Sequence, residues 1–120
     1  MPTSQQFTPI DSYDLVATIP NGTANSQQID LAGNSLCGLF MPAVFTGTSI
    51  KIGVAVTSGV AAQVVQKDEA GGGDYTITVT ANKFIPITNL AILAGARFIT
   101  LTSSSNEGAD RAITLAVRPV

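Results

Sequence analysis

The chain has 120 residues, of which 45% are hydrophobic and 12% are charged, and this length suits one domain with one hydrophobic core. Its net charge is −2 and its six basic residues are spread singly, which argues against nucleic-acid binding, because that function depends on clustered cations. Histidine is absent, so a Ser-His-Asp triad is excluded, and the commonest metal ligand and neutral-pH general base is missing.

The N-terminal residues 1–12 (MPTSQQFTPIDS) are polar and contain two prolines, which is typical of an arm rather than of a core. Residues 13–120 are then expected to form a single β-sandwich domain. Phe7 and Ile10 are the apolar exceptions within the arm. We expect these two side chains to dock on a partner or, as an equal alternative, on their own domain.

Residues 49–56 (SIKIGVAV) alternate with the period of two that is typical of a half-buried β-strand. The even-numbered residues, from Ile50 to Val56, are expected to face the core. The odd-numbered residues Lys51, Gly53 and Ala55 form a small and nearly uncharged opposite face, which suits close packing against a neighbour.

Similar short runs are predicted as strands along the rest of the chain, at 13–19, 27–31, 36–41, 62–67, 74–81, 84–87, 97–102 and 111–117. The almost continuous apolar run 36–41 (LCGLFM) predicts a strand buried on both faces, with an inert buried thiol at Cys37. In 74–81, Tyr75, Ile77 and Val79 are expected to share the core face. Residues 88–95 suit one turn of helix.

About eight short strands, separated by turn residues roughly every 10 positions, predict an all-β fold. A jelly-roll β-sandwich of antiparallel strands is the first choice. An immunoglobulin-like sandwich is the second, because the cysteines and the tryptophan that mark that fold are missing.

No catalytic pattern accompanies these strands. The sequence has no G-x-S-x-G elbow, and the glycines 71–73 lack the Lys-Ser/Thr of a phosphate-binding loop. Asp68, Glu69 and Asp74 flank these glycines with carboxylate oxygens, but their spacing matches no calcium loop. We therefore predict no enzyme activity, no metal and no cofactor.

The low charge also bears on partners and location. A surface with few charges does little to keep neighbouring molecules apart, which favours a homo-oligomer or a place in a larger assembly. No segment has the pattern of a signal peptide, and no apolar run reaches 18 residues, so we expect synthesis in the cytoplasm and no membrane contact. Asp110 and Arg111, just before the last strand, are expected either to bridge to another loop or subunit or to remain a solvated pair.

Five groups of residues are distinctive in their order, namely 26–33 (SQQIDLAG), 36–43 (LCGLFMPA), 45–50 (FTGTSI), 94–101 (AGARFITL) and 109–111 with 113–115 (ADR, ITL). Together they resemble a group of small proteins encoded near the head genes of tailed bacteriophages and prophages. The resemblance covers residues 22–118. In that group the strand after F-T-G-T is commonly followed by a Ser-x-Asp-Gly turn, whereas this chain has Val56-Thr57-Ser58-Gly59, without the aspartate.

The resemblance implies a virion structural protein with a jelly-roll core, namely a capsid decoration (cement) protein that binds and stabilises the outside of the assembled head. It implies the major capsid protein as partner, a trimer or other small homo-oligomer, and a location on the capsid surface after synthesis in the host cytoplasm. Six residues then become candidate contacts with the capsid or another subunit: Phe7, Ile10, Phe45, Thr46, Asp110 and Arg111.

Two alternatives remain open. One is a carbohydrate-binding jelly-roll module, which needs exposed aromatic side chains. Most of the seven aromatic residues lie in apolar runs and are expected in the core. The other is a head–tail or tail structural component built on the same scaffold.

Overall fold

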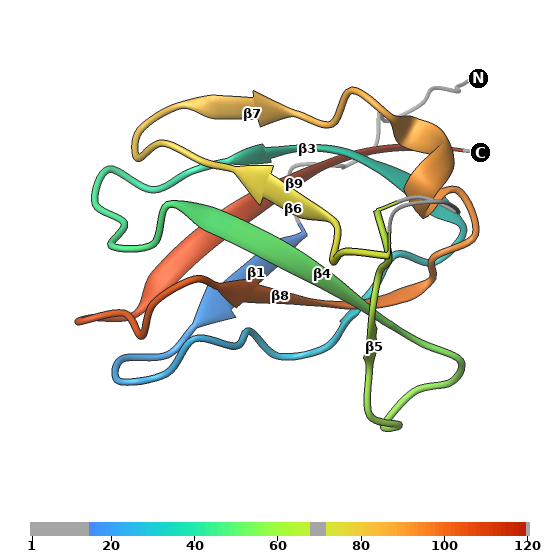
Figure 1. Ribbon diagram of the computed structural model, residues 1–120, viewed down its shortest axis with the longest axis horizontal. Helices are drawn as coiled ribbons and strands as arrows, with labels where there is room; N and C mark the ends of the chain where they lie inside the picture. Colours follow the sequence, from blue (N-terminus) through green and yellow to red (C-terminus); the bar gives the residue numbers. More distant parts are fainter. Residues whose placement is uncertain (1–14, 68–71, 120) are drawn as a thin grey trace, which may run out of the picture.

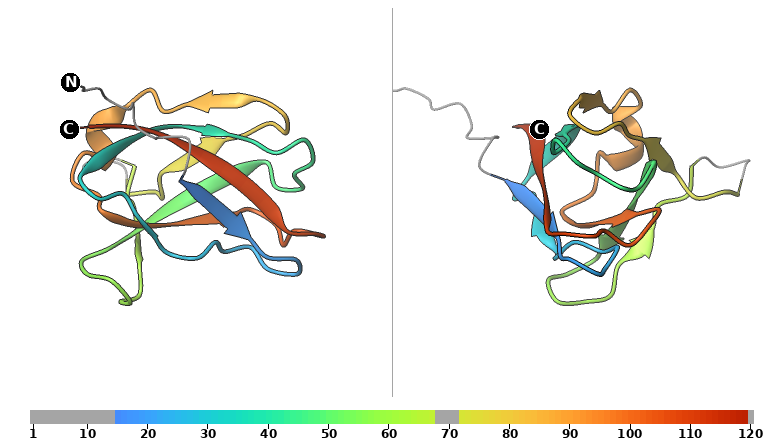
Figure 2. Two further views of the ribbon diagram at one scale, coloured as in Figure 1. Left: turned by 180° about the vertical axis from the view of Figure 1, so that it is seen from behind. Right: turned by 90° about the vertical axis from the view of Figure 1, so that its left-hand side faces the viewer.

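Two antiparallel β-sheets face each other in the computed structural model, which describes residues 15–67 and 72–119 (Figures 1 and 2). The strands are β1 (Val16–Ile19), β2 (Ile29–Asp30), β3 (Asn34–Phe40), β4 (Ser49–Ala55), β5 (Gln63–Val64), β6 (Thr76–Thr78), β7 (Phe84–Pro86), β8 (Phe98–Ser103) and β9 (Arg111–Pro119). A short 3-10 helix, η2 (Leu90–Leu93), precedes β8, at the place where one helical turn was predicted. The predicted arm, 1–12, lies outside the described residues.

The strand order confirms the predicted jelly-roll sandwich. One sheet has the order β1-β9-β3-β7, and the other has the order β2-β8-β4-β5 with β6 also paired to β4. β5 pairs with one end of β4 and β6 with the other, so these two short strands share one position. From β1 to β4, and again from β6 to β9, each successive strand lies in the opposite sheet, which is the wrapping of a jelly roll.

The core lies between the two sheets and is built from alternate residues of their strands. Its fully buried aliphatic side chains are Ile19, Leu31, Leu36, Leu39, Ile50, Ile52, Leu93, Ile99, Leu101, Ile113 and Leu115. The predicted core face of β6 is confirmed, since Ile77 and Val79 are buried and Tyr75 packs against the core.

The predicted facing of β4 is correct at Ile50 and Ile52 but wrong at Val56, which is 85% exposed. Pairing between β4 and β8 ends at Ala55 opposite Phe98, so the chain has already left the sheet at Val56. Alternation along a strand implies burial only as far as the sheet continues.

The opposite face of β4 is covered by the chain itself at Gly53, and so it is not a free packing face there. A Cβ atom placed on Gly53 would lie 2.8 Å from the Cβ of Ala62, in the segment that leads into β5. Ala55 is also buried. The expectation that this face packs against a neighbouring molecule is therefore wrong at both positions.

The prediction that 36–41 is buried on both faces is also wrong. A β-bulge interrupts the pairing of β3 with β9 between Leu36 and Gly38, and Cys37 at this bulge is partly exposed. Phe40 is 38% exposed on the outer face of the four-stranded sheet. The inner face of β3 packs on the core, while its outer face has no second layer among the described residues.

Candidate functional site

Four of the six predicted contact residues lie around one buried side chain, Glu107, which is 1% exposed. Phe7 and Ile10 lie outside the described residues. Phe45 packs against the edge of the core, and Thr46 follows it in the turn between β3 and β4. Arg111 begins β9 and Asp110 precedes it. We refer to this end of the sandwich as the Glu107 end.

The Glu107 carboxylate accepts four hydrogen bonds. Oε1 accepts from the backbone N–H of Thr46 at 2.8 Å and from Nε of Arg111 at 3.0 Å. Oε2 accepts from the backbone N–H of Gly47 and from the hydroxyl of Ser103, both at 3.0 Å. The carboxylate therefore joins the turn before β4, the end of β8 and the start of β9.

The backbone of Glu107 adds a fourth segment to this junction. Its N–H donates to the carbonyl of Thr23 at 2.8 Å, and its carbonyl accepts from the N–H of Gly22 at 2.7 Å. Close by, the carboxylate of Asp110 accepts from the backbone N–H of Asn21 at 2.8 Å. Asp110 thus bridges to another loop of its own chain, which is one of the two roles expected for it.

These hydrogen bonds shift the acidity of Glu107. Burial, the largest single influence, raises the pKa of its carboxyl, whereas the hydrogen bonds from Thr46, Arg111, Gly47 and Ser103 lower it, and the net pKa lies below its ordinary value. The group is therefore ionised at neutral pH and pairs with Arg111. An ionised carboxylate whose oxygens are already occupied by donors supports the fold and offers no vacant site for acid–base chemistry.

The sequence did not identify Glu107. It lies in a polar loop, and its partners Thr46 and Gly47 are about 60 positions away along the chain. The one local signal is Arg111, four residues later, but this spacing has meaning only on a helix, and the segment is a loop.

Two further ion pairs lie elsewhere among the described residues. Asp74 accepts from Lys51 at 2.9 Å, and Asp30 accepts from Arg97 at 3.0 Å, and both pairs are exposed. The hydrogen bond from Arg97 is the main reason that the pKa of Asp30 is lowered. Among residues 15–67 and 72–119, no group of three metal-ligating side chains comes together. Asp68 and Glu69 lie outside these ranges.

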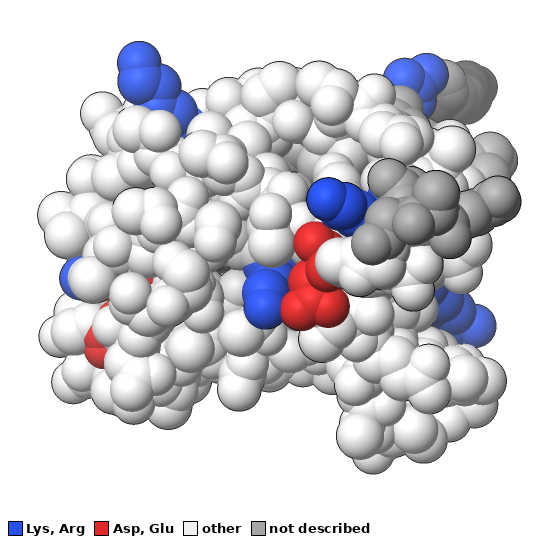
Figure 3. Space-filling model, in the orientation of Figure 1, with Lys and Arg blue, Asp and Glu red and all other residues white. Residues whose placement is uncertain are grey.

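Three exposed large apolar side chains lie on the hairpin between β4 and β5, which we call the 56–64 hairpin. Val56, Val60 and Val64 are 85%, 48% and 52% exposed. Residues 52–66 contain no charge, and the hairpin projects from the body of the sandwich as an uncharged lobe (Figures 2 and 3). An open groove of about 500 Å³ lies beside it, lined by residues 54–56, 63–65, Gly95 and Arg97.

Gln28 holds this hairpin in place. Its side-chain oxygen accepts from the N–H of Gly59 at 3.0 Å, and its side-chain nitrogen donates to the carbonyl of Val60 at 3.4 Å. Because its tip is tied to the segment before β2, the hairpin presents its valines in a defined arrangement. Pre-ordered apolar groups of this kind lose little entropy on binding.

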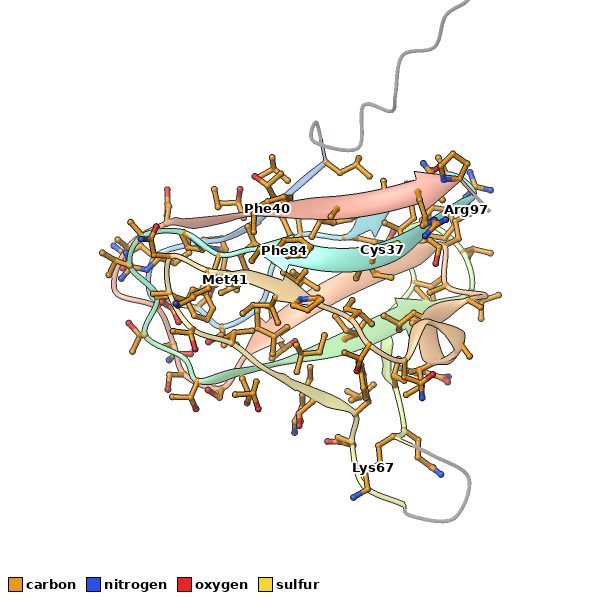
Figure 4. All side chains as sticks on the ribbon, turned by 90° about the horizontal axis from the view of Figure 1, so that it is seen from above. Cys37, Phe40, Met41, Lys67, Phe84 and Arg97 are labelled. Carbon is orange, nitrogen blue, oxygen red and sulfur yellow. The ribbon has the colours of Figure 1, made fainter. Side chains whose placement is uncertain are left out.

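A second apolar surface crosses the outer face of the four-stranded sheet. Val16, Thr114, Phe40 and Phe84 lie opposite one another on β1, β9, β3 and β7, and we call them the outer row. The rings of Phe40 and Phe84 are 4.7 Å apart, centroid to centroid (Figure 4). Both are substantially exposed, so the expectation that most aromatic residues belong to the core is wrong for this pair.

Glycine at position 38 makes this ring pair possible. A Cβ atom there would lie 2.7 Å from Cε1 of Phe84 and 3.0 Å from the carbonyl oxygen of Ile85. The ring of Phe84 therefore covers the backbone of Gly38, as aromatic side chains do over glycines in other sheets.

Comparisons with protein-family models, with curated proteins and with solved structures gave no match for this chain. The resemblance to phage head proteins therefore rests on the sequence segments that carry it. In the part of the chain that the structure describes, no helix is long and apolar enough to span a membrane.

Proposed function

We propose that this chain is a virion structural protein, a capsid decoration protein that binds the outside of the assembled phage head and stabilises it. The observation that carries the proposal is the 56–64 hairpin, a projecting and uncharged loop with three exposed valines. Exposed apolar side chains that gather on one projecting loop are typical of surfaces that bind another protein. The sequence resemblance implies the major capsid protein as the partner.

A small homo-oligomer, with a trimer favoured, fits this role. Each copy presents one hairpin, so a trimer engages several capsid subunits at once and gains avidity that no single contact supplies. Because the oligomer binds the assembled shell and not its separated subunits, it shifts the equilibrium toward the shell. The Glu107 end, which includes Phe45, Thr46, Asp110 and Arg111, is then a contact between copies or a second contact with the head.

Binding of the purified protein to decoration-free heads tests this proposal. We expect saturable binding that raises the melting temperature of the heads. Val60→Asp should weaken binding strongly, because it places a charge in a contact that excludes water. Val44→Asp is the corresponding variant for the Glu107 end, since Val44 is 60% exposed and lies next to Phe45.

The two variants assign the contact. Loss of binding in Val60→Asp alone supports the hairpin, whereas loss in Val44→Asp alone places the contact at the Glu107 end. No binding of the unchanged protein to heads refutes the decoration function. Imaging of intact particles then distinguishes a capsid surface location from a head–tail or tail location.

A carbohydrate-binding module remains a second candidate because of the exposed ring pair Phe40–Phe84, since aromatic faces can stack on sugars. The outer face around the rings carries few polar side chains, which leaves little to recognise sugar hydroxyls. Glycan-array binding that is lost in Phe84→Ala, without binding to heads, would favour this candidate over decoration.

A further inference from the structure

We propose that the N-terminal segment of this chain, residues 1–14, docks on the outer row of its own domain, with Phe7 and Ile10 against the rings of Phe40 and Phe84. The sequence left open whether these two apolar side chains bind a partner or their own domain. The structure supplies an apolar acceptor surface on the sheet that the segment joins. This inference does not depend on the proposed function.

The acceptor surface is a continuous uncharged face. In addition to the outer row, the registers place Thr18 beside Ala112, and Gly38 between Ala116 and Pro86, on the same side of the sheet. Phe40 and Phe84 are 38% and 47% exposed, and Val16 is 36% exposed. Covering these side chains with apolar groups removes them from water, which is favourable in proportion to the apolar area buried.

The point of attachment places the segment beside this surface. Leu15 immediately precedes β1, and its carbonyl accepts from the N–H of Leu115 on β9 at 2.8 Å. Val16, the next residue, is itself a member of the outer row. The segment therefore joins the domain at the edge of the face that we propose it covers.

The length of the segment suffices for this path. Three strand spacings separate Val16 from Phe84, which corresponds to about 14 Å. Phe7 precedes Val16 by nine residues, which span up to about 30 Å when extended, so the chain can turn at Pro9 and still reach both rings. A tether of this length also gives the segment a high effective concentration at its own domain, which favours it over a second copy.

The charges complement one another. Residues 1–14 contain Asp11 and Asp14 and no lysine or arginine. Lys83, next to Phe84, and Arg118, near the end of β9, are exposed at opposite ends of the outer face, and neither forms an ion pair with the described residues. Acidic groups on the segment thus meet basic groups at the rim of an apolar surface.

Paramagnetic relaxation measured by NMR tests the proposal on the full chain. A nitroxide label is attached at Ala116→Cys, on the outer face beside Gly38, in a Cys37→Ser background. We expect it to broaden the signals of Phe7 and Ile10. The matched control is a label at Thr100→Cys, which lies on β8 in the other sheet and should leave these signals sharp.

Two further samples make the result decisive. Phe7→Ser, which leaves the described domain unchanged, should abolish the broadening of Ile10. In a mixture of labelled chains with isotope-enriched unlabelled chains, docking on the same molecule predicts no broadening. Broadening in that mixture would show that a second copy is the occupant, and sharp Phe7 and Ile10 signals in the labelled chain would show that the segment does not dock here; either result overturns the proposal.

Discussion

Substitution of Glu107 by glutamine should destabilise the domain far more than its loop position suggests. Glutamine has the same shape, but it has one acceptor oxygen in place of two and carries no charge. The carboxylate of Glu107 uses both oxygens, each with two donors. In either orientation of the glutamine amide, its NH2 group faces two of the four donors, and these donors then lose their acceptor.

The orientation that costs least keeps the amide oxygen toward Thr46 and Arg111. The hydroxyl of Ser103 can rotate and accept from the amide, but the N–H of Gly47 is left buried without a partner, which costs about 1–3 kcal/mol. The hydrogen bond from Arg111, whose side chain is 14% exposed, also loses its ionic character, which costs about 1–2 kcal/mol more. We expect a total loss of about 3 kcal/mol in the free energy of unfolding, or about 12 °C in Tm for a domain of this size.

Thermal and urea unfolding of Glu107→Gln and Asp110→Asn measure this difference. Asp110→Asn is the matched control, because Asp110 is exposed and the amide oxygen introduced by the substitution can still accept from the N–H of Asn21. We expect the control to change stability by less than about 1 kcal/mol. If Glu107→Gln melts within about 3 °C of the control, then the Glu107 junction does not hold these segments together and the reasoning fails.

Three further predictions follow from the same structure. The pKa of Glu107 in the folded state lies below its ordinary value of 4.5. The ionised carboxylate therefore contributes to the free energy of unfolding above pH 4.5, and this contribution is lost as the pH falls through the lowered pKa. Measured from pH 6 downward, Tm should drop in acid, and it should drop less in Glu107→Gln. Gly38→Ala should displace the ring of Phe84 and lower the free energy of unfolding by about 1–2 kcal/mol. In a double-mutant cycle with Phe84→Ala, the two effects should not be additive. Additive effects would mean that the ring does not cover Gly38. Ile77→Asp, at a side chain only 6% exposed, should unfold the domain, and a native circular dichroism spectrum for this variant would contradict the assigned facing of β6.

The fold was predictable from the sequence to a considerable extent because strand formation here follows local pattern. Alternation of apolar and polar residues, or a short apolar run in the case of β3, located the strands of the sandwich, and Pro42, Gly33 and similar residues marked the turns. Even the two-residue strands β2 and β5 lie within predicted runs, although tertiary pairing sets their actual length. The helical turn at η2 was likewise indicated by its spacing.

The wrong predictions of burial concern residues whose exposure depends on whether a distant segment covers them. Val56 continues the alternation of β4 but extends beyond the last pair with β8. Phe40 lies in an apolar run, yet its face of the four-stranded sheet has no covering layer among the described residues. Periodicity gives the face on which a side chain lies, but it does not show whether another element covers that face.

The candidate site was predicted only in part for a similar reason. Thr46 and Arg111 were predicted separately, and the structure joins them through Glu107, with Phe45 and Asp110 as their neighbours in the chain. Glu107 was missed because a buried carboxylate is recognised by its donors, and these come from distant segments. The exposure of Val56 on the 56–64 hairpin was missed because this residue was assigned to the core.

The low charge of this chain has different consequences at its two apolar surfaces. Among the described residues, three ion pairs use six of the fourteen charged residues, namely Lys51–Asp74, Arg97–Asp30 and Arg111–Glu107. The 56–64 hairpin lies within residues 52–66, which carry no charge, and the outer row is itself uncharged, so neither surface has charges of its own that oppose association. Deletion of residues 1–14 separates the two surfaces. If the segment covers its own outer row, the deletion exposes two phenylalanines and should promote self-association without weakening binding to heads through the hairpin. If the segment instead contacts the capsid, the same deletion should weaken head binding and leave the isolated protein as soluble as before.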